Sequence, residues 1–144
     1  TGGQEILRNL KKDSIGYPID IETNLTFPEL VKLYKEAKIY WHATGFGEDI
    51  IKYPEKAEHF GITTLEAMGA GCVPVVFRAG GQNDIINDGR NGYLWKNEKD
   101  FLEINKKLIS DNNKLEEIAE ESVVRSKDFS NSDFDEKIEN IISI

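Results

Sequence analysis

The sequence contains few of the residues that form disulfides and zinc clusters. Cys72 is its one cysteine, and the 144 residues include two histidines. A single cysteine excludes an internal disulfide, and so few sulfur and imidazole ligands leave no zinc-binding spacing. We therefore expect no metal and no cofactor, and the unpaired cysteine favours a reducing compartment such as the cytoplasm.

Long apolar runs and an excess of basic residues are also missing. No run approaches the roughly 20 apolar residues that a membrane-spanning helix needs. Lys and Arg total 18 against 26 Asp and Glu, giving a net charge of −8, whereas a nucleic-acid-binding surface needs clustered positive charge. We expect no nucleic-acid partner. The chain starts at Thr1 with neither an initiator methionine nor a signal-peptide pattern, so we also expect it to be part of a longer protein.

Apolar periodicity and turn residues predict alternating strands and helices. Thr26 and Glu29 have the spacing of a helix capping box, and Pro28 suits the first helical turn. Pro74 lacks an N–H donor, so it should stand at the start of its strand. The predicted helices are Glu5–Lys12, Thr26–Ala37, Gly61–Ala70, Asn83–Asn87, Asn97–Ile109, Leu115–Val124 and Phe134–Ile142, and the predicted strands are Tyr17–Thr23, Lys38–Ala43, Val73–Phe77 and Tyr93–Trp95.

This alternation predicts an α/β fold, a Rossmann-like parallel sheet with helices on both faces. Ligands of such sheets bind at the carboxyl ends of the strands. The loops expected there are Thr23–Leu25, His42–Ala57 and Arg78–Gln82. His42 ends its strand on this side, which makes it a candidate binding residue, although a lone histidine can also be structural.

The loop and helix that follow Glu58 form the centre of the predicted site. Gly61 opens the helix, so unpaired N–H groups and the positive end of the helix dipole can meet an anion without an intervening side chain. Gly80 and Gly81 offer a second backbone-lined hollow for an anion or for sugar hydroxyls. Glu66, eight positions after Glu58, can accept hydrogen bonds from a diol. Two acids so separated suit a nucleotide sugar, with the ribose at one end and the sugar at the other.

Each of these residues also has a purely structural interpretation. Thr63 and Glu66 have capping-box spacing, so Glu66 can instead cap its own helix. Glu58 can be a solvated loop acid, and Gly80-Gly81 can be a plain turn. The residues alone leave these alternatives open.

A composite of short motifs resembles a known family. It resembles the C-terminal, donor-binding domain of the family-four retaining GT-B glycosyltransferases, and with the earlier helix that contains Leu30, Leu33 and Tyr34 the similarity covers nearly the whole chain. The resemblance implies the donor half of an enzyme of polysaccharide biosynthesis, which transfers a sugar from a nucleoside-diphosphate sugar to a glycan or a lipid-linked acceptor. The matching motifs are Glu58 with Phe60-Gly61-Ile62, Glu66-Ala67-Met68, Gly71, Pro74-Val75-Val76, Gly80-Gly81 and Asn91-Gly92-Tyr93-Leu94.

The resemblance implies roles for the matching residues. Glu58 would be the catalytic carboxylate nearest the reacting sugar carbon, with no nucleophile assigned, and Glu66 would hold the ribose hydroxyls. The remaining substrate-binding candidates are Gly61, Ile62 and Thr63 at the pyrophosphate or sugar, Thr23, Asn24 and Leu25 at the base, and His42, Gly80 and Gly81 at the same edge of the sheet.

The resemblance also implies parts that this chain does not contain. Family members carry an Arg and a Lys directed at the diphosphate, and no residue here matches them. The family's strand order is 3-2-1-4-5-6. We therefore expect residues 1–130 to be a donor-binding domain without its first two strands. The fourth strand of the family's order would then present an open edge. Residues 131–144 are expected to form a C-terminal helix.

The N-terminal acceptor domain would be missing as well. We therefore expect this fragment alone to be inactive and the full-length protein to meet a membrane only peripherally. Two other functions fit the residues, namely a non-catalytic module that binds a nucleotide sugar or phosphate, and an α/β domain whose glycines are structural.

Overall fold

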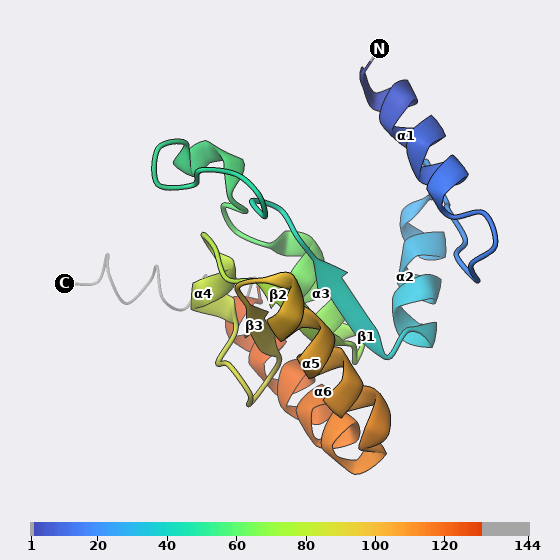
Figure 1. Cartoon of the computed structure of the whole chain (residues 1–144). Helices are drawn as coiled ribbons and strands as arrows, with labels where there is room; N and C mark the ends of the chain where they lie inside the picture. Colours follow the sequence, from blue (N-terminus) through green and yellow to red (C-terminus); the bar gives the residue numbers. More distant parts are fainter. Residues whose placement is uncertain (1, 131–144) are drawn as a thin grey trace. The chain divides into compact units, whose positions relative to one another are not determined.

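The computed structural model describes residues 2–130, which fall into two compact units, Thr1–Leu30 and Val31–Ile144. Figure 1 labels the helices and strands of each unit. The segment predicted as a C-terminal helix lies outside the described residues. The elements are α1 Gly2–Asp13, α2 Phe27–Glu36, β1 Ile39–His42, η1 Pro54–Lys56, α3 Ile62–Gly69, β2 Val73–Phe77, α4 Gln82–Ile85, β3 Tyr93–Trp95, α5 Glu98–Ser110, α6 Asn112–Ser126 and η2 Lys127–Phe129.

The first unit contains the predicted helix α1 but not the predicted strand Tyr17–Thr23. Residues 14–26 form neither helix nor strand, and none of their side chains is buried. The alternating pattern was misleading because a strand also needs a neighbour for its N–H and C=O groups, and no described strand pairs with this segment. The prediction of a strand here is therefore wrong.

The start of α2 follows its predicted capping chemistry in part. The Glu29 carboxylate reaches back and accepts hydrogen bonds from the Thr26 backbone N–H at 2.8 Å and from the Thr26 hydroxyl at 2.6 Å. These bonds lower the pKa of Glu29, the hydroxyl having the larger effect. The Thr26 side chain thus donates to Glu29, whereas a full capping box would have it accept from the helix backbone.

The second unit is built on a parallel sheet of order β1-β2-β3. In the register, Ile39 pairs with Val73, and Val76 pairs with both His42 and Leu94. Because every pair is parallel, the three strands end at one edge of the sheet. These strands are the ones predicted from the sequence.

Helices cover both faces of this sheet, as predicted. Successive residues of β2 point to opposite faces, so Val75 and Val76 belong to different core clusters. In Figure 1, α5 and α6 lie side by side along the sheet. One cluster joins Val73, Val75 and Trp95 to Leu108 of α5 and to Leu115 and Ile118 of α6, and the other joins Val76 and Leu94 to Met68 of α3 and to Ile85 and Ile86.

The outer edge of β1 has no paired strand within the described residues. Trp41 stands on this edge strand with 60% of its surface exposed. Its indole N–H donates to Asn105 Oδ1 at 2.8 Å, and its ring meets Phe101 edge to face. β1 therefore presents an open edge with an aromatic side chain beside it.

Local signals set the ends of the remaining helices. Asn97 accepts a hydrogen bond from the Asp100 N–H and caps α5, and Asp111 accepts from the Lys114 N–H and caps α6. Gly71, with φ +93°, follows α3 in the left-handed conformation that commonly ends a helix. The predicted cap of α5 and the predicted stop at Gly71 are confirmed, whereas the sequence predicted no cap for α6, which begins before the predicted Leu115.

Candidate functional site

His42 ends β1 and directs its imidazole toward residues from two separate loops. Its Nε2 lies 3.2 Å from Glu58 Oε2 and 3.3 Å from Thr44 Oγ1. Its Nδ1 lies 3.4 Å from Gln82 Nε2. The His42 side chain is only 12% exposed. The strand end thus holds the ring between the loop before α3 and the start of α4.

The Glu58 carboxylate is held in place from both of its oxygens. Oε1 accepts hydrogen bonds from the backbone N–H groups of Gly61 at 3.1 Å and Phe60 at 3.3 Å, while Oε2 meets His42. The side chain remains 27% exposed. Glu58 is therefore not a loop acid surrounded by solvent. It is an oriented carboxylate that a ligand can still reach.

Helix α3 begins with open backbone donors. Its N-cap is Gly61, which has φ +93° and no side chain to cap the helix. The first N–H groups of a helix have no intrahelical partner, and Ile62 and Thr63 of this turn are exposed. The positive φ favours glycine here, and a Cβ would also crowd the end of the Ile85 side chain, 2.9 Å from Cδ1. This turn offers an anion both donors and the positive end of the dipole.

Glu66 does not cap its own helix. The helix starts at Ile62, so Thr63 lies inside the first turn rather than at the cap, and the capping interpretation is wrong. The Glu66 side chain is half-buried and accepts no hydrogen bond from the described residues. Its carboxylate is thus available to a ligand.

The buried Tyr34 and the half-buried Tyr40 stand near Glu66. Burial raises the pKa of Tyr34 to about 12, with smaller contributions from Tyr40 and Glu66. Burial likewise raises the pKa of Tyr40, whose hydroxyl donates to Thr63 Oγ1 at 2.9 Å. Both phenols therefore stay neutral at physiological pH and keep their hydrogen-bond donors.

Gly80 and Gly81 bring the two glycine-rich loops into contact. The Gly81 N–H donates to the Glu58 carbonyl at 2.8 Å. A Cβ added to Gly80 would stand 2.0 Å from the Glu58 carbonyl oxygen, and a Cβ added to Gly81 would stand 2.4 Å from the His59 carbonyl oxygen. The pair is more than a turn, because no larger residue would let the loop that carries Glu58 approach so closely.

Alanine at Gly80 is expected to destabilise the protein far more than alanine at Gly71. Both glycines have positive φ, but a Cβ at Gly71 meets nothing within 4 Å. Gly71→Ala should cost about 1–2 kcal/mol of backbone strain, and Gly80→Ala should cost a further 1–3 kcal/mol or so because its clash is with backbone. Urea denaturation of the two variants measures this difference. Equal losses in the free energy of unfolding would show that the loop contact is not tight.

The other predicted residues fall in two groups. In the second unit, Ile62 and Thr63 form the start of α3, and Gly80 and Gly81 lie against the backbone of Glu58 and His59. The predicted base-binding residues Thr23, Asn24 and Leu25 belong to the first unit, where Asn24 has φ 57°.

Sequence reasoning missed Gln82 and Thr64. Gln82 is 1% exposed and Thr64 is fully buried, and the Gln82 amide donates to Thr64 Oγ1 at 3.0 Å. The one local signal was a polar residue placed directly after Gly81 at the start of a helix.

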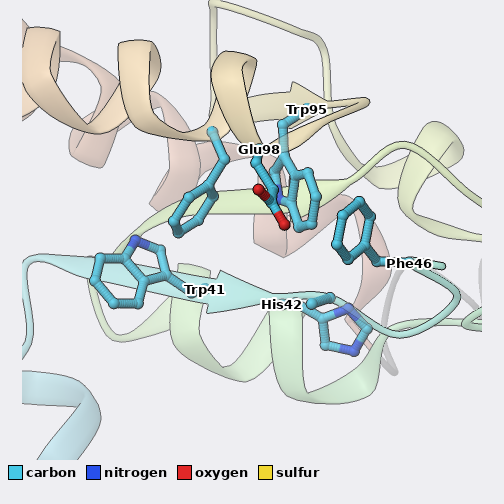
Figure 2. A pocket seen from close by; sticks show the side chains of 7 residues that line it. Trp41, His42, Phe46, Trp95 and Glu98 are labelled. Atoms are coloured by element: carbon cyan, nitrogen blue, oxygen red, sulfur yellow. The ribbon is translucent and has the colours of Figure 1, made fainter.

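An aromatic hollow of about 320 Å³ is lined by residues of β1, β3 and α5 and by Phe46. Figure 2 shows Trp41 and Phe46 on either side of it, with Trp95 and Glu98 between them. The Trp95 indole N–H is buried without a partner among the described residues. His42 lines this hollow as well, whereas neither Glu58 nor Glu66 does. The carboxylates of the candidate site therefore lie outside the hollow, next to the start of α3.

Residues 2–130 contain neither a cluster of metal ligands nor a membrane-spanning helix. This part of the chain has no group of three or more His, Cys, Asp or Glu placed to hold a metal ion. None of its helices combines the length and the hydrophobicity that crossing a bilayer requires.

The comparison with protein families decides the class of this protein. Residues 9–123 match the sequence model of the family described as glycosyl transferases group 1. The chain belongs to the group 1 glycosyltransferases. The matched range includes every predicted site residue of this glycosyltransferase chain, from Thr23 to Gly81.

Curated relatives of this glycosyltransferase chain are all much longer. A GDP-Man:Man(3)GlcNAc(2)-PP-Dol alpha-1,2-mannosyltransferase of Dictyostelium discoideum is 27% identical over 90% of this chain and 24% of its own length. An alpha-1,3/1,6-mannosyltransferase, ALG2, of the same organism is 42% identical over 41% of this chain and 14% of its own. A glycogen synthase of Chlamydia muridarum is 40% identical over 42% of this chain and 13% of its own length. The chain therefore spans about a quarter or less of these relatives.

Solved glycosyltransferase structures share the fold. Anabaena HepE, in complex with UDP and glucose, superposes with a TM-score of 0.76 at 21% identity, over 99% of this chain and 37% of its own. The C-terminal domain of LpcC, a group 1 glycosyltransferase of Francisella tularensis, superposes with a TM-score of 0.60 at 24% identity, over 87% of this chain and 60% of its own. These matches confirm the predicted fold, the parallel α/β sheet of a GT-B glycosyltransferase.

Proposed function

We propose that this chain is the donor-binding part of a retaining glycosyltransferase, which moves a sugar from a nucleoside-diphosphate sugar to a glycan or a lipid-linked acceptor. The observation that carries the proposal is the position of the Glu58 carboxylate. It is bound to the Gly61 N–H and to His42, directly before the uncapped first turn of α3. A carboxylate and a set of anion-binding donors thus stand next to each other.

Sugar transfer requires these two kinds of group. As the bond from the anomeric carbon to the leaving phosphate oxygen breaks, positive charge develops on the sugar and the phosphate keeps the electron pair. In the proposed site Glu58 faces the sugar carbon, and the N–H groups of Ile62 and Thr63 with the start of α3 face the diphosphate. His42, Gly80 and Gly81 are proposed on the sugar side, where His42 contacts the Glu58 carboxylate and the two glycines lie against the backbone that carries it.

The half-buried Glu66 would hold the nucleoside end of the donor by accepting hydrogen bonds from the ribose hydroxyls. The HepE structures are complexes with UDP or UDP-glucose, and the Dictyostelium relative is named for GDP-Man. Both names refer to a nucleoside diphosphate, and we propose a nucleoside-diphosphate sugar as the donor for this chain.

The proposal assigns the acceptor side to parts of the protein outside this chain. Turnover would then require the longer protein, and the chain alone would bind the donor without transferring sugar. A cytoplasmic location, a peripheral contact with membranes and a role in polysaccharide biosynthesis belong to the same proposal.

Calorimetric titration of the full chain with UDP, GDP and ADP tests donor binding. We expect one diphosphate to bind, with its nucleoside monophosphate binding more weakly because fewer phosphate oxygens meet the start of α3. Release of nucleoside diphosphate from the matching sugar donor by the longer protein then tests transfer. Binding without turnover in the longer protein would favour a non-catalytic binding module, and no binding of any diphosphate would contradict the proposal.

A further inference from the structure

Gln82 is a buried polar side chain that contacts His42 of the candidate site. It is the first residue of α4 and is 1% exposed. Its amide nitrogen lies 3.4 Å from His42 Nδ1 and 3.0 Å from Thr64 Oγ1, so one NH₂ group joins β1 to α3. Its carbonyl oxygen is buried and has no hydrogen-bond partner within the described residues.

The chemistry of the neighbours determines which nitrogen of His42 carries the proton. An ionised carboxylate only accepts hydrogen bonds, so the contact between Glu58 Oε2 and His42 Nε2 at 3.2 Å requires a proton on Nε2. In a neutral imidazole the other nitrogen, Nδ1, is then an acceptor. The group that faces Nδ1 must be a donor, and the Gln82 NH₂ group is that donor.

We infer that Gln82 is a positioning residue, which holds the His42 ring in the tautomer whose Nε2–H points at Glu58. The inference rests on the proposed function where it concerns turnover, but the tautomer itself is independent of it. Gln82 contacts neither the carboxylate of Glu58 nor that of Glu66 in the structure, so it acts through His42. It thereby sets the direction of the imidazole's hydrogen bond to the carboxylate at the sugar.

A simple packing role explains less of what is observed. Gln82 does fill space beside Gly61, where a Cβ would lie 3.2 Å from the Gln82 amide nitrogen. An apolar side chain of similar length would fill the same space without burying an unpaired carbonyl oxygen. The Gln82 NH₂ group, however, donates to Thr64 Oγ1, and its nitrogen also lies 3.4 Å from His42 Nδ1, where an apolar side chain would offer no donor. The amide's donors are therefore what the site uses.

Nitrogen-15 NMR of the imidazole rings tests the inference directly. His42 and the exposed His59 are the two histidines of the chain, so the second ring serves as an internal reference. At neutral pH we expect His42 in wild type as the Nε2–H tautomer. In Gln82→Glu the shape is kept but an acceptor replaces the donor, and we expect His42 to gain a proton on Nδ1. A wild-type ring protonated on Nδ1, or a His42 spectrum unchanged in Gln82→Glu, overturns the inference.

Matched variants separate charge, shape and hydrogen bonding. Gln4→Glu makes the same chemical change at the other glutamine, which is exposed on α1, and should leave the His42 signals unmoved. Thr64→Val removes the second acceptor of the amide and should shift His42 toward a mixture of tautomers. If Gln82→Glu does not fold, the wild-type tautomer and Thr64→Val still decide the question.

Kinetics of the longer protein link the tautomer to the reaction. We expect Gln82→Met to lower kcat on the order of tenfold to a hundredfold with little change in KM, because a misdirected group near the reacting carbon affects the transition state. A variant whose kcat is unchanged and whose only effect is a changed KM would overturn the positioning role. If no variant and no wild type turns over, the proposed function fails, while the NMR result on Gln82 stands by itself.

Discussion

Glu58→Ala in the longer protein is expected to lower kcat on the order of a hundredfold to ten-thousandfold while leaving nucleoside-diphosphate binding nearly unchanged. The carboxylate lies on the sugar side of the proposed site and would act on charge that develops only in the transition state. The diphosphate would be held by backbone donors of α3, which the substitution keeps. Initial-rate kinetics and calorimetry on the same protein preparations measure the two effects.

Two further variants give this test its controls. Glu58→Gln keeps the size of the side chain and an acceptor for the Gly61 N–H, so it isolates the loss of negative charge. Glu55→Gln removes an exposed acid from the same loop, in η1, and should leave both quantities unchanged. If nucleotide affinity falls in parallel with turnover in Glu58→Gln, the carboxylate serves binding rather than chemistry and its proposed role is wrong.

Glu66→Ala is expected to weaken nucleoside-diphosphate binding on the order of a hundredfold. Hydrogen bonds from ligand hydroxyls to a charged acceptor contribute about 1.5–3 kcal/mol each, and the ribose offers two hydroxyls. The variant should also lose discrimination between the ribonucleotide and its 2′,3′-dideoxy analogue, which wild type should bind weakly. Calorimetry with both nucleotides measures the affinities.

Glu120→Ala is the matched control for Glu66→Ala. Glu120 is an exposed acid on α6, and its removal changes the net charge by the same amount. Equal loss of affinity in both variants would indicate a general electrostatic effect. A Glu66→Ala protein that still prefers the ribonucleotide would place the ribose elsewhere.

The local sequence predicted the helices and strands of the second unit well, because their signals are local. The cap at Asn97, the glycine after α3 and the apolar run of β2 each depend on neighbouring residues. Tyr17–Thr23 has the same kind of alternating pattern, yet it forms no strand. Whether a strand forms depends on a partner, and alternation within one segment contains no information about that partner.

By itself, the sequence determined the α/β fold and the order of the strands and helices from β1 to α6, and it placed Glu58, Gly61 and Glu66 around the start of one helix. Their chemical environment was decided only by the tertiary structure. His42 and Gln82 are 40 positions apart and meet because β1 and β2 are neighbours in a parallel sheet. The packing of the loops at this edge of the sheet likewise brings Gly81 against Glu58. Such contacts depend on strand order and loop packing, so no local pattern in the chain predicts that the His42–Glu58 pair has a buried amide behind it.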